Sequence, residues 1–411
     1  MFSWEFPPIS HGGLARHVQD LSEALAEQGH SLYIITQGGN NIPKKEKING
    51  VNVIRTDPVK ISPNNFIDHI LQLNYQMVEE ALLLYQDLEE VDIIHGHDWL
   101  VFWASKVLKH ALVKPLIFTI HATESGRNQG IYNNMQRYIN DVEWYSTFEA
   151  WKVIVCSNYM KNEVRGLFQL PKDKLAVIEN GVNPENYECD YSEEFRKQYC
   201  SPWEDMIFYV GRIVREKGIQ VLIQAMPELL SENPSTKLVI AGKGGFLDDL
   251  KRQANYLGIS DRIYFTGFIS DEVRNKLYQA ANVAVFPSLY EPFGIVALEA
   301  MCTKTPVIVS DVGGMTEFVE HKKTGLKVES NNPYQLAHTI KNVLDNKEEY
   351  KKMADRAYKL VNQKFTWDKI ASKTAEIYQQ VLEEYEESNW NKEIDDTYID
   401  NEMLAGSFKY K

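Results

Sequence analysis

Two glutamates, Glu291 and Glu299, stand eight residues apart in an otherwise largely apolar stretch, Pro287–Ala300. The first falls in a loop and the second about one turn into a helix, so the start of that helix offers free backbone amides to an anion. These amides belong to Phe293, Gly294 and Ile295. A carboxylate buried among phosphates would be costly, so Glu291 is expected to face sugar hydroxyls. Glu299 alone is typical of a solvated helical glutamate, but an apolar window rarely holds two unpaired charges.

Two cations follow another predicted strand. Arg212 and Lys217 stand five residues apart, between Val210 and a predicted helix. Arginine offers a bidentate fork and lysine a point charge, which together suit a diphosphate. Taken alone, the segment is explained better as a solvated loop with scattered charges.

A pair of glycines, Gly12 and Gly13, lies between an aromatic first strand and the helix predicted from Ala15. Glycines at such a turn let the backbone approach a ligand closely, and the helix start after them favours an anion. An ordinary turn explains the pair equally well.

Histidines mark two strand ends in the first half of the chain. His95 and His97 precede Asp98 and Trp99, and His121 lies just past the carboxyl end of another strand. A His-x-His-Asp segment can bind a metal, but catalytic metal sites need further ligands, and no acidic cluster stands near His121. No metal is therefore expected. A lone histidine is usually structural, although the carboxyl end of a strand favours a functional one.

These residues need strands and helices to position them, and the chain alternates apolar β-branched runs with amphipathic stretches. The helices expected in the first half are Ala15–Gly29, Phe66–Leu88 and Trp99–His110. The strands expected there are Leu32–Thr36, Val51–Arg55, Val91–His95, Pro115–Ile120, Val153–Ser157 and Leu175–Ile178. Such repetition predicts parallel strands joined by right-handed crossovers.

The pattern breaks at turn residues after Asn180, and a polar linker is expected from there to about Asp205. A second series follows, with strands at Met206–Gly211, Lys237–Ala241, Arg262–Thr266, Val283–Pro287 and Pro306–Ser310. Its helices are expected at Ile219–Leu230, Phe246–Leu257, Asp271–Ala281 and Ile295–Cys302. The sequence thus predicts an α/β fold of two doubly wound units, residues 1–183 and 205–366, with the ligand site in the cleft between them.

Charge and composition narrow the function. Among 411 residues, 57 acids and 44 bases give a net charge of −13, so a nucleic-acid partner is not expected. From Glu383 to Lys411 the chain carries nine acids and three bases, a net charge of −6. The tail, residues 387–411, is expected to be a solvated extension after a last helix at Trp367–Glu386. No apolar run approaches a membrane span, and four cysteines without zinc spacing favour a reducing compartment, so the cytoplasm is the expected location.

Taken together, these motifs resemble one family over about residues 1–385. The chain looks like a retaining nucleotide-sugar glycosyltransferase of the two-Rossmann (GT-B) type, in family 4, near the glycogen and starch synthases. The Glu-x7-Glu loop from Glu291 to Glu299 is the strongest part, followed by Gly211-Arg212 with Lys217. The segment His95–Trp99 is similar to the HxHDW of glycogen synthases. In contrast, Ser10-His11 precede Gly12-Gly13, where glycogen synthases commonly have a lysine.

The resemblance implies roles for the motif residues. Arg212 and Lys217 would hold the donor diphosphate, Glu291 would contact the donor sugar, and Glu299 would hold the ribose. His121 would lie beside the sugar, and the Gly12-Gly13 loop would close over the phosphates. The nucleotide base is expected near Phe268 and Ile269.

The expected activity is transfer of glucose from ADP- or UDP-glucose to an α-glucan or maltosaccharide, without a cofactor. Trp99 would stack on an acceptor sugar and Asp98 would accept a hydroxyl hydrogen bond, unless Trp99 is simply a core residue. A small sugar, a sugar phosphate or a lipid is the alternative acceptor. A metal-dependent hydrolase and an inactive sugar-binding scaffold are the competing classes of function. The resemblance also places the last helix, about residues 367–386, on the first domain.

Overall fold

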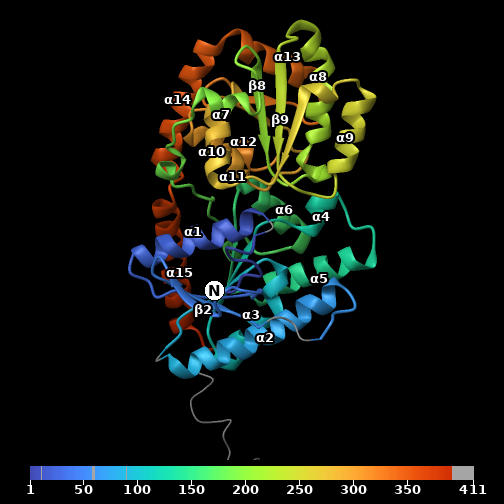
Figure 1. Ribbon diagram of the computed structural model, residues 1–411. Coiled ribbons are helices and arrows are strands. Elements are labelled where there is room, and N and C mark those ends of the chain that lie inside the picture. The colour runs from blue at the N-terminus through green and yellow to red at the C-terminus, as the bar shows by residue number, and fades with distance from the viewer. Residues whose placement is uncertain (11, 58–60, 89, 391–411) are drawn as a thin grey trace, which may run out of the picture.

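The computed structural model describes residues 1–10, 12–57, 61–88 and 90–390, which form two α/β domains (Figure 1). The acidic tail expected over residues 387–411 lies outside the described residues from position 391 on. In Figure 1 the first domain, coloured blue to green, lies below the second, coloured green to orange. The predicted fold class, two doubly wound units in series, is confirmed.

The first domain contains two sheets that the first residues of the chain join. Their orders are β1-β3-β2 and β4-β5-β6-β7, and Phe2 forms parallel bridges with both Ile35 in β1 and Gly96 in β4. The strands are β1 (Tyr33–Thr36), β2 (Lys45–Ile48), β3 (Val51–Arg55), β4 (Ile94–His97), β5 (Leu116–Ile120), β6 (Lys152–Val155) and β7 (Leu175–Val177). All paired strands are parallel except β2 with β3.

The helices of this domain follow the strands closely. They are α1 (Gly13–Glu27), α2 (Phe66–Asp87), α3 (Phe102–Leu112), α4 (Glu124–Asn128), α5 (Asn134–Glu149) and α6 (Asn158–Phe168). A 3-10 turn, η1 (Trp99–Val101), precedes α3 inside the helix predicted at Trp99–His110, and another, η2 (Lys172–Lys174), precedes β7. The strand predicted at Val91–His95 begins later, at Ile94, and β2 was not predicted because its KEKI sequence lacks a buried face.

The second domain is built on one parallel sheet of six strands in the order β10-β9-β8-β11-β12-β13. The strands are β8 (Asp205–Val210), β9 (Thr236–Ala241), β10 (Ile263–Gly267), β11 (Val283–Phe286), β12 (Val307–Ser310) and β13 (Leu326–Val328). The chain order reverses between β8 and β11, and a crevice for a ligand opens at the carboxyl ends of strands at such a switch point. The loops that carry Arg212, Lys217 and Glu291 leave these two strands.

Helices cover both faces of this sheet, as apolar strands buried throughout require. They are α7 (Glu193–Lys197), α8 (Ile219–Glu232), α9 (Leu247–Tyr256), α10 (Asp271–Ala280), α11 (Ile295–Cys302), α12 (Met315–Phe318), α13 (Pro333–Asp345) and α14 (Lys347–Lys364). Three 3-10 turns are η3 (Pro184–Tyr187), η4 (Arg215–Lys217) and η5 (Ser260–Arg262). The expected linker is thus partly structured, and Tyr187 and Cys200 in it are buried.

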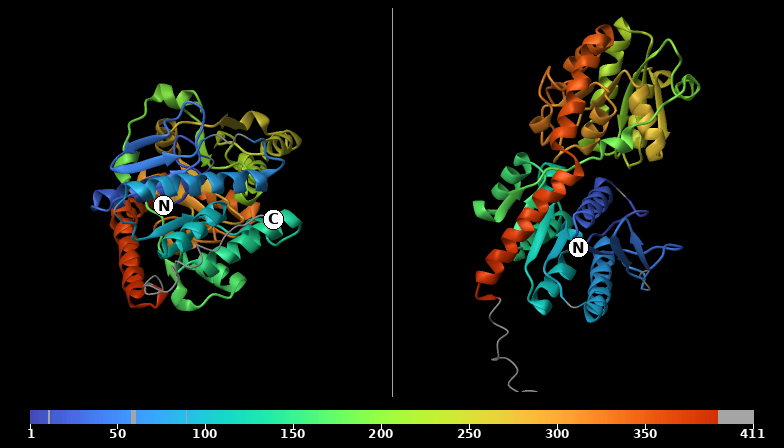
Figure 2. Two further views of the ribbon diagram at one scale, coloured as in Figure 1. Left: turned by 90° about the horizontal axis from the view of Figure 1, so that it is seen from below. Right: turned by 90° about the vertical axis from the view of Figure 1, so that its left-hand side faces the viewer.

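The last helix, α15 (Trp367–Glu387), leaves the second domain and packs against α1 of the first. Figure 2 shows this red helix running from the upper domain along the lower one. The Tyr378 hydroxyl lies 2.7 Å from Nδ1 of His95, and the Tyr385 hydroxyl donates to the carbonyl of Val113 at 2.6 Å. Within the part of the chain that the structure describes, no helix is long and apolar enough to cross a bilayer.

Candidate active site

Two loops of the second domain are locked together at the switch point. Gly218 ends η4 with φ +68°, and a Cβ there would lie 1.8 Å from the carbonyl oxygen of Pro287, so only glycine fits. The amides of Leu289 and Tyr290 both donate to the carbonyl of Glu216, at 2.8 and 3.2 Å. This junction fixes Lys217 beside the loop that carries Glu291.

Lys217 and Glu291 form a buried ion pair. The Lys217 Nζ lies 2.7 Å from Oε2 of Glu291, and the Ser288 hydroxyl donates to the same oxygen at 3.0 Å. The two side chains are 17% and 8% exposed. The positive charge of Lys217 is therefore already balanced by a carboxylate, whereas a clamp of two free cations was expected.

Arg212 is the more accessible cation, with 45% of its side chain exposed and Glu216 at 3.3 Å. It faces the glycine loop of the other domain, because a Cβ on Gly12 would lie 3.5 Å from Cδ of Arg212. A Cβ on Gly13 would lie 3.8 Å from Cδ1 of Ile295. The structure thus brings the Gly12-Gly13 loop, Arg212 and the start of α11 together across the cleft.

The start of α11 is built for close approach of a ligand. Gly294, its N-cap, has φ +98° and no side-chain hydrogen bond to the helix. Phe293 is buried against Phe318 and Phe365 in the second domain, and it belongs to the same loop as Glu291. Unsatisfied amides at a helix start attract anions, which agrees with the expected donor phosphates.

Glu299 lies one turn further and is enclosed by protein groups. Arg16 of α1 lies 2.9 Å from its Oε1, and the hydroxyls of Tyr187 and Tyr278 donate to its two oxygens at 3.1 Å each. Burial raises the pKa of this carboxyl, but Arg274 and Arg16 together with the two hydroxyls hold the pKa below its ordinary value. The ribose contact expected of Glu299 would have to share or displace these partners.

The expected base-binding segment lies at the same edge of the sheet, after β10. Phe268 is 73% exposed, and Nζ of Lys243 lies 5.5 Å from its ring centroid. Ile269 is partly buried next to it. An exposed ring at the mouth of the cleft can stack on a planar base.

His121 of the first domain is held by Asp98. The backbone amide of His121 donates to Oδ1 of Asp98 at 2.9 Å, and Asp98 itself is buried with φ +60°. Burial and the nearby Arg127 lower the pKa of His121 to about 3, so its imidazole is neutral. Asp98 thus positions the backbone of His121, and the hydroxyl contact expected of Asp98 stays a prediction.

Trp99 needs a correction. Its ring is only 5% exposed and packs edge-on against Phe66, with ring centroids 6.1 Å apart. A ring in the core has no free face for a sugar, so this structure favours the core alternative over acceptor stacking.

The imidazoles of His17, His97 and His121 lie close together. His17 was not among the residues predicted from the sequence. His17 of α1, His97 at the end of β4 and His121 each place one nitrogen within 4.8 Å of the others. His95 is stacked on His97 but bonds to Tyr378 and Thr119 instead. The metal set considered from the sequence, His95, His97 and Asp98, is therefore not the set that the fold brings together.

Several residues at the domain interface also escaped the sequence analysis. The Tyr290 hydroxyl donates to Glu163 at 2.8 Å, and the Ser157 hydroxyl donates to the carbonyl of Pro292 at 2.7 Å. Glu317 accepts from the amides of Asn158 and Tyr159 at 3.0 and 2.7 Å, so the second domain caps α6 of the first. Of these residues, Tyr290 lies next to Glu291 and Ser157 fits the family resemblance, so both carried a local signal in the sequence, whereas Glu163 and Glu317 carried none.

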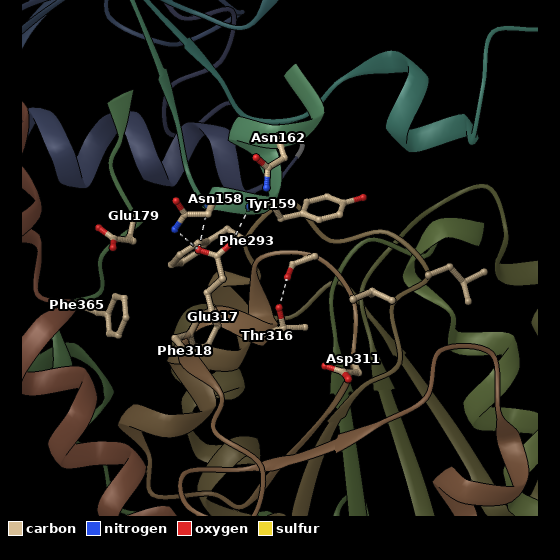
Figure 3. Close-up of a pocket in the computed structure, with 13 residues that line it drawn as sticks. Asn158, Tyr159, Asn162, Glu179, Phe293, Asp311, Thr316, Glu317, Phe318 and Phe365 are labelled. Carbon is tan, nitrogen blue, oxygen red and sulfur yellow. Dashed lines mark hydrogen bonds between the residues drawn. The ribbon is translucent and has the colours of Figure 1, made fainter. Parts of the chain in front are cut away.

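A cavity of about 890 Å³ opens beside this cap (Figure 3). Glu317, Asn158 and Tyr159 lie together at its centre, with Phe365 at one side and Asp311 at another. Of the residues expected to bind the donor, Phe293 alone is among those that line it, so the cavity lies behind the Glu291 loop and apart from Arg212 and Lys217. Its lining is Asn158, Tyr159, Asn162, Glu179, Leu289, Phe293, Asp311, Val312, Gly313, Thr316, Glu317, Phe318 and Phe365.

Comparison with known proteins agrees with this geometry. Residues 11–186 match Glycosyltransferase Family 4, and residues 191–360 match Glycosyl transferases group 1. An uncharacterised glycosyltransferase of Methanocaldococcus jannaschii is 40% identical over 93% of this chain and 98% of its own length. Glycogen synthase of Mycobacterium tuberculosis is 33% identical over 92% and 93%. Sucrose-phosphate synthase from Thermosynechococcus elongatus superposes with a TM-score of 0.81 at 27% identity, over 93% of this chain and 98% of that one.

Two α/β domains, with the switch point of the second facing the glycine loop of the first, define the fold of a glycosyltransferase of the GT-B class. The chain belongs to glycosyltransferase family 4, and within it to the relatives of glycogen synthase and sucrose-phosphate synthase.

Proposed function

We propose that the protein is a retaining glucosyltransferase that moves glucose from ADP- or UDP-glucose to an α-glucan or maltosaccharide. The observation that carries the proposal is the convergence of Arg212, the Lys217–Glu291 pair and the open start of α11 opposite the Gly12-Gly13 loop. The glucan acceptor is supported by the glycogen synthase relative.

The proposed reaction needs no dedicated general base. The bond between the anomeric carbon and the diphosphate oxygen breaks, the acceptor oxygen bonds to that carbon on the same face, and the departing diphosphate takes the acceptor proton. Arg212 and Lys217 stabilise the charge that develops on the leaving group, which is the term that preorganised cations supply best. Lys217 pairs with both Glu291 and the diphosphate in this scheme. The Glu291 carboxylate therefore fixes Nζ of Lys217 and lies close enough to contact the donor sugar.

No metal or organic cofactor enters this scheme, since two cations replace the usual metal ion. All four thiols, those of Cys156, Cys189, Cys200 and Cys302, are free. Free thiols favour a reducing compartment, so we place the reaction in the cytoplasm.

A second acceptor class is supported by two observations. Trp99 and Asp98, the acceptor contacts expected for a glucan, are buried, and the solved structure described above is a sucrose-phosphate synthase. The alternative is therefore a family 4 transferase that acts on a small sugar or sugar phosphate, or on a lipid.

The test is a panel of donors against acceptors. ADP- and UDP-glucose are each paired with maltosaccharides, glycogen, hexose phosphates and a lipid acceptor, with and without EDTA, and released nucleoside diphosphate is measured. We expect release that depends on a maltosaccharide and survives EDTA, with an α-linked product by NMR. Release that depends on a hexose phosphate or lipid selects the alternative acceptor. A β-linked product overturns retention, and no transfer from either donor overturns both proposals.

A further inference from the structure

The imidazoles of His17, His97 and His121 gather in the first domain. They come from α1, the end of β4 and the loop after β5, so the chain has to fold before they meet. The ring centroids are 4.4 Å apart for His17 and His121, 5.5 Å for His17 and His97, and 5.6 Å for His97 and His121. His17 and His97 are buried, so contact with solvent does not account for the meeting of the three rings, and among the described residues no carboxylate pairs with them.

Two ring nitrogens of this group are buried without a hydrogen-bond partner. Nδ1 of His17 lies 2.7 Å from Oδ1 of Asn180, so it carries the proton and leaves a lone pair on Nε2. That Nε2 has no partner within the described structure, and neither does Nε2 of His97. His17 thus donates one N–H to a fixed oxygen and leaves its other nitrogen free, which is the arrangement of a metal ligand. Nδ1 of His97 instead lies against Nε2 of His121.

The spacing also suits a transition metal. Zinc–nitrogen distances of about 2.0–2.1 Å place the nitrogens of a tetrahedral site about 3.3–3.4 Å apart. Nδ1 of His97 and Nε2 of His121 lie 3.3 Å apart and share a proton that a metal ion would replace, and one nitrogen of each of the three imidazoles lies within 4.8 Å of the others.

The charge state of the group is favourable as well. Burial lowers the pKa of all three imidazoles well below the ordinary value, so they are neutral, the form that binds metal. The guanidinium of Arg127 is the nearby cation that would repel a bound metal ion, and Asp98 is the carboxylate close to Arg127.

We propose that His17, His97 and His121 form a binding site for a Zn²⁺-class cation, and that its occupation inhibits glycosyl transfer. Three histidines leave the fourth position to water. Because the proposed function places His121 beside the donor sugar, a metal that holds its imidazole would restrict the adjustment that the closed site requires. The inhibition rests on the proposed function, whereas the binding does not.

The binding test uses the full chain after EDTA treatment and desalting. Co²⁺ and Zn²⁺ are the probes, with visible absorption for tetrahedral Co²⁺ and calorimetry for Zn²⁺. The variants are His17→Gln and His97→Gln, and the matched control is His30→Gln, an exposed histidine just past the end of α1. We expect one tight equivalent in the wild type and the control, and at least about 100-fold weaker binding in each of the two variants.

A wild type that binds no stoichiometric metal overturns the site, whether or not any variant folds. Equal binding in the wild type and in folded His17→Gln and His97→Gln, with folding checked by circular dichroism, also overturns it. In the transfer assay we expect excess Zn²⁺ to inhibit the wild type and to spare the residual activity of His17→Gln. Tight binding without inhibition overturns the inhibitory role. If no acceptor supports transfer at all, the proposed function fails while the binding result still decides the site.

Discussion

Lys217 pairs with a buried carboxylate and is also expected to contact the donor diphosphate. Its Nζ lies 2.7 Å from Glu291, whereas Arg212 at the cleft edge pairs loosely with Glu216 at 3.3 Å. Removing either cation should therefore have different side effects. The Lys217 change leaves a buried carboxylate without its partner, and the Arg212 change leaves the partly exposed Glu216 without its looser contact.

For Arg212→Ala and Lys217→Ala, we expect turnover to fall by about 10²–10³, the loss seen when one preorganised donor is removed. Lys217→Ala should also lower the melting temperature. Arg215→Ala, an exposed cation in the same turn, serves as the control. Wild-type turnover in both folded variants would contradict the role of the two cations.

Trp99 gives the second prediction at this scale. Because its ring is buried against Phe66, Trp99→Ala should destabilise the protein by about 3–5 kcal/mol, as truncation of a large core side chain does. Urea unfolding measures this, and acceptor and donor KM should shift together in whatever fraction stays folded. A selective rise in acceptor KM with unchanged unfolding would restore the sugar-stacking role.

At the scale of elements, β4, β5, α1 and α15 enclose four neutral histidines. Burial is the largest cause that lowers the pKa of His17, His95, His97 and His121. In the unfolded chain they titrate near 6.5. Below that pH the unfolded state binds more protons, so the free energy of unfolding decreases as the pH falls.

We expect this loss to begin near pH 6.5 and to continue toward pH 3, the pKa of His121, at up to about 1.4 kcal/mol per pH unit for each histidine. Two buried carboxyls act oppositely, because burial raises the pKa of Glu143 to about 8 and that of Asp20 to about 7. Urea unfolding at pH 7.5, 6 and 5 measures the slope. His95→Gln should reduce it and His30→Gln should not, and equal slopes in all three proteins would count against the histidines as its source.

The segment around α15 and Trp390 gives a second prediction at this scale. The tail over residues 387–411 is expected to be a solvated extension, but the Trp390 ring stacks on Trp151 with ring centroids 6.0 Å apart and lies 5.0 Å from Nζ of Lys109. We therefore expect a chain that lacks residues 390–411 to melt at a lower temperature than a chain that lacks residues 391–411. Deletion from residue 366 should prevent folding of the first domain, because it removes the Trp367 and Ile370 core contacts. A stable chain without α15 would contradict this.

At the scale of the whole molecule, specific polar groups join the two domains. Glu317 caps α6, Tyr290 reaches Glu163, and Arg16 pairs with Glu299. Interfaces of this kind permit relative domain motion. Closure of the cleft over a donor would have to keep or exchange these contacts.

For Glu317→Ala we expect kcat/KM to fall, because the two amides of α6 lose the acceptor that holds them against the second domain. Small-angle scattering should show a broader distribution of domain orientations, and the free energy of unfolding should fall by about 1 kcal/mol, the value of a helix cap. Glu320→Ala is the control, because Glu320 is exposed and pairs only locally, with Lys323. If both variants behave alike, the cap does not set the domain orientation.

The sequence by itself determined the two α/β domains, the positions of most strands along the chain and the motifs at the strand ends, because burial on both faces of a parallel sheet leaves a local apolar record. It also determined which residues belong to the switch point, since Arg212, Lys217 and Glu291 directly follow their strands. Only the tertiary structure decided what these groups contact. The Lys217–Glu291 pair, the enclosure of Glu299 by Arg16, the burial of Trp99 and the meeting of His17 with His97 and His121 all join distant segments. Such contacts depend on how helices pack across a sheet and across the cleft, and local spacing carries no record of that packing.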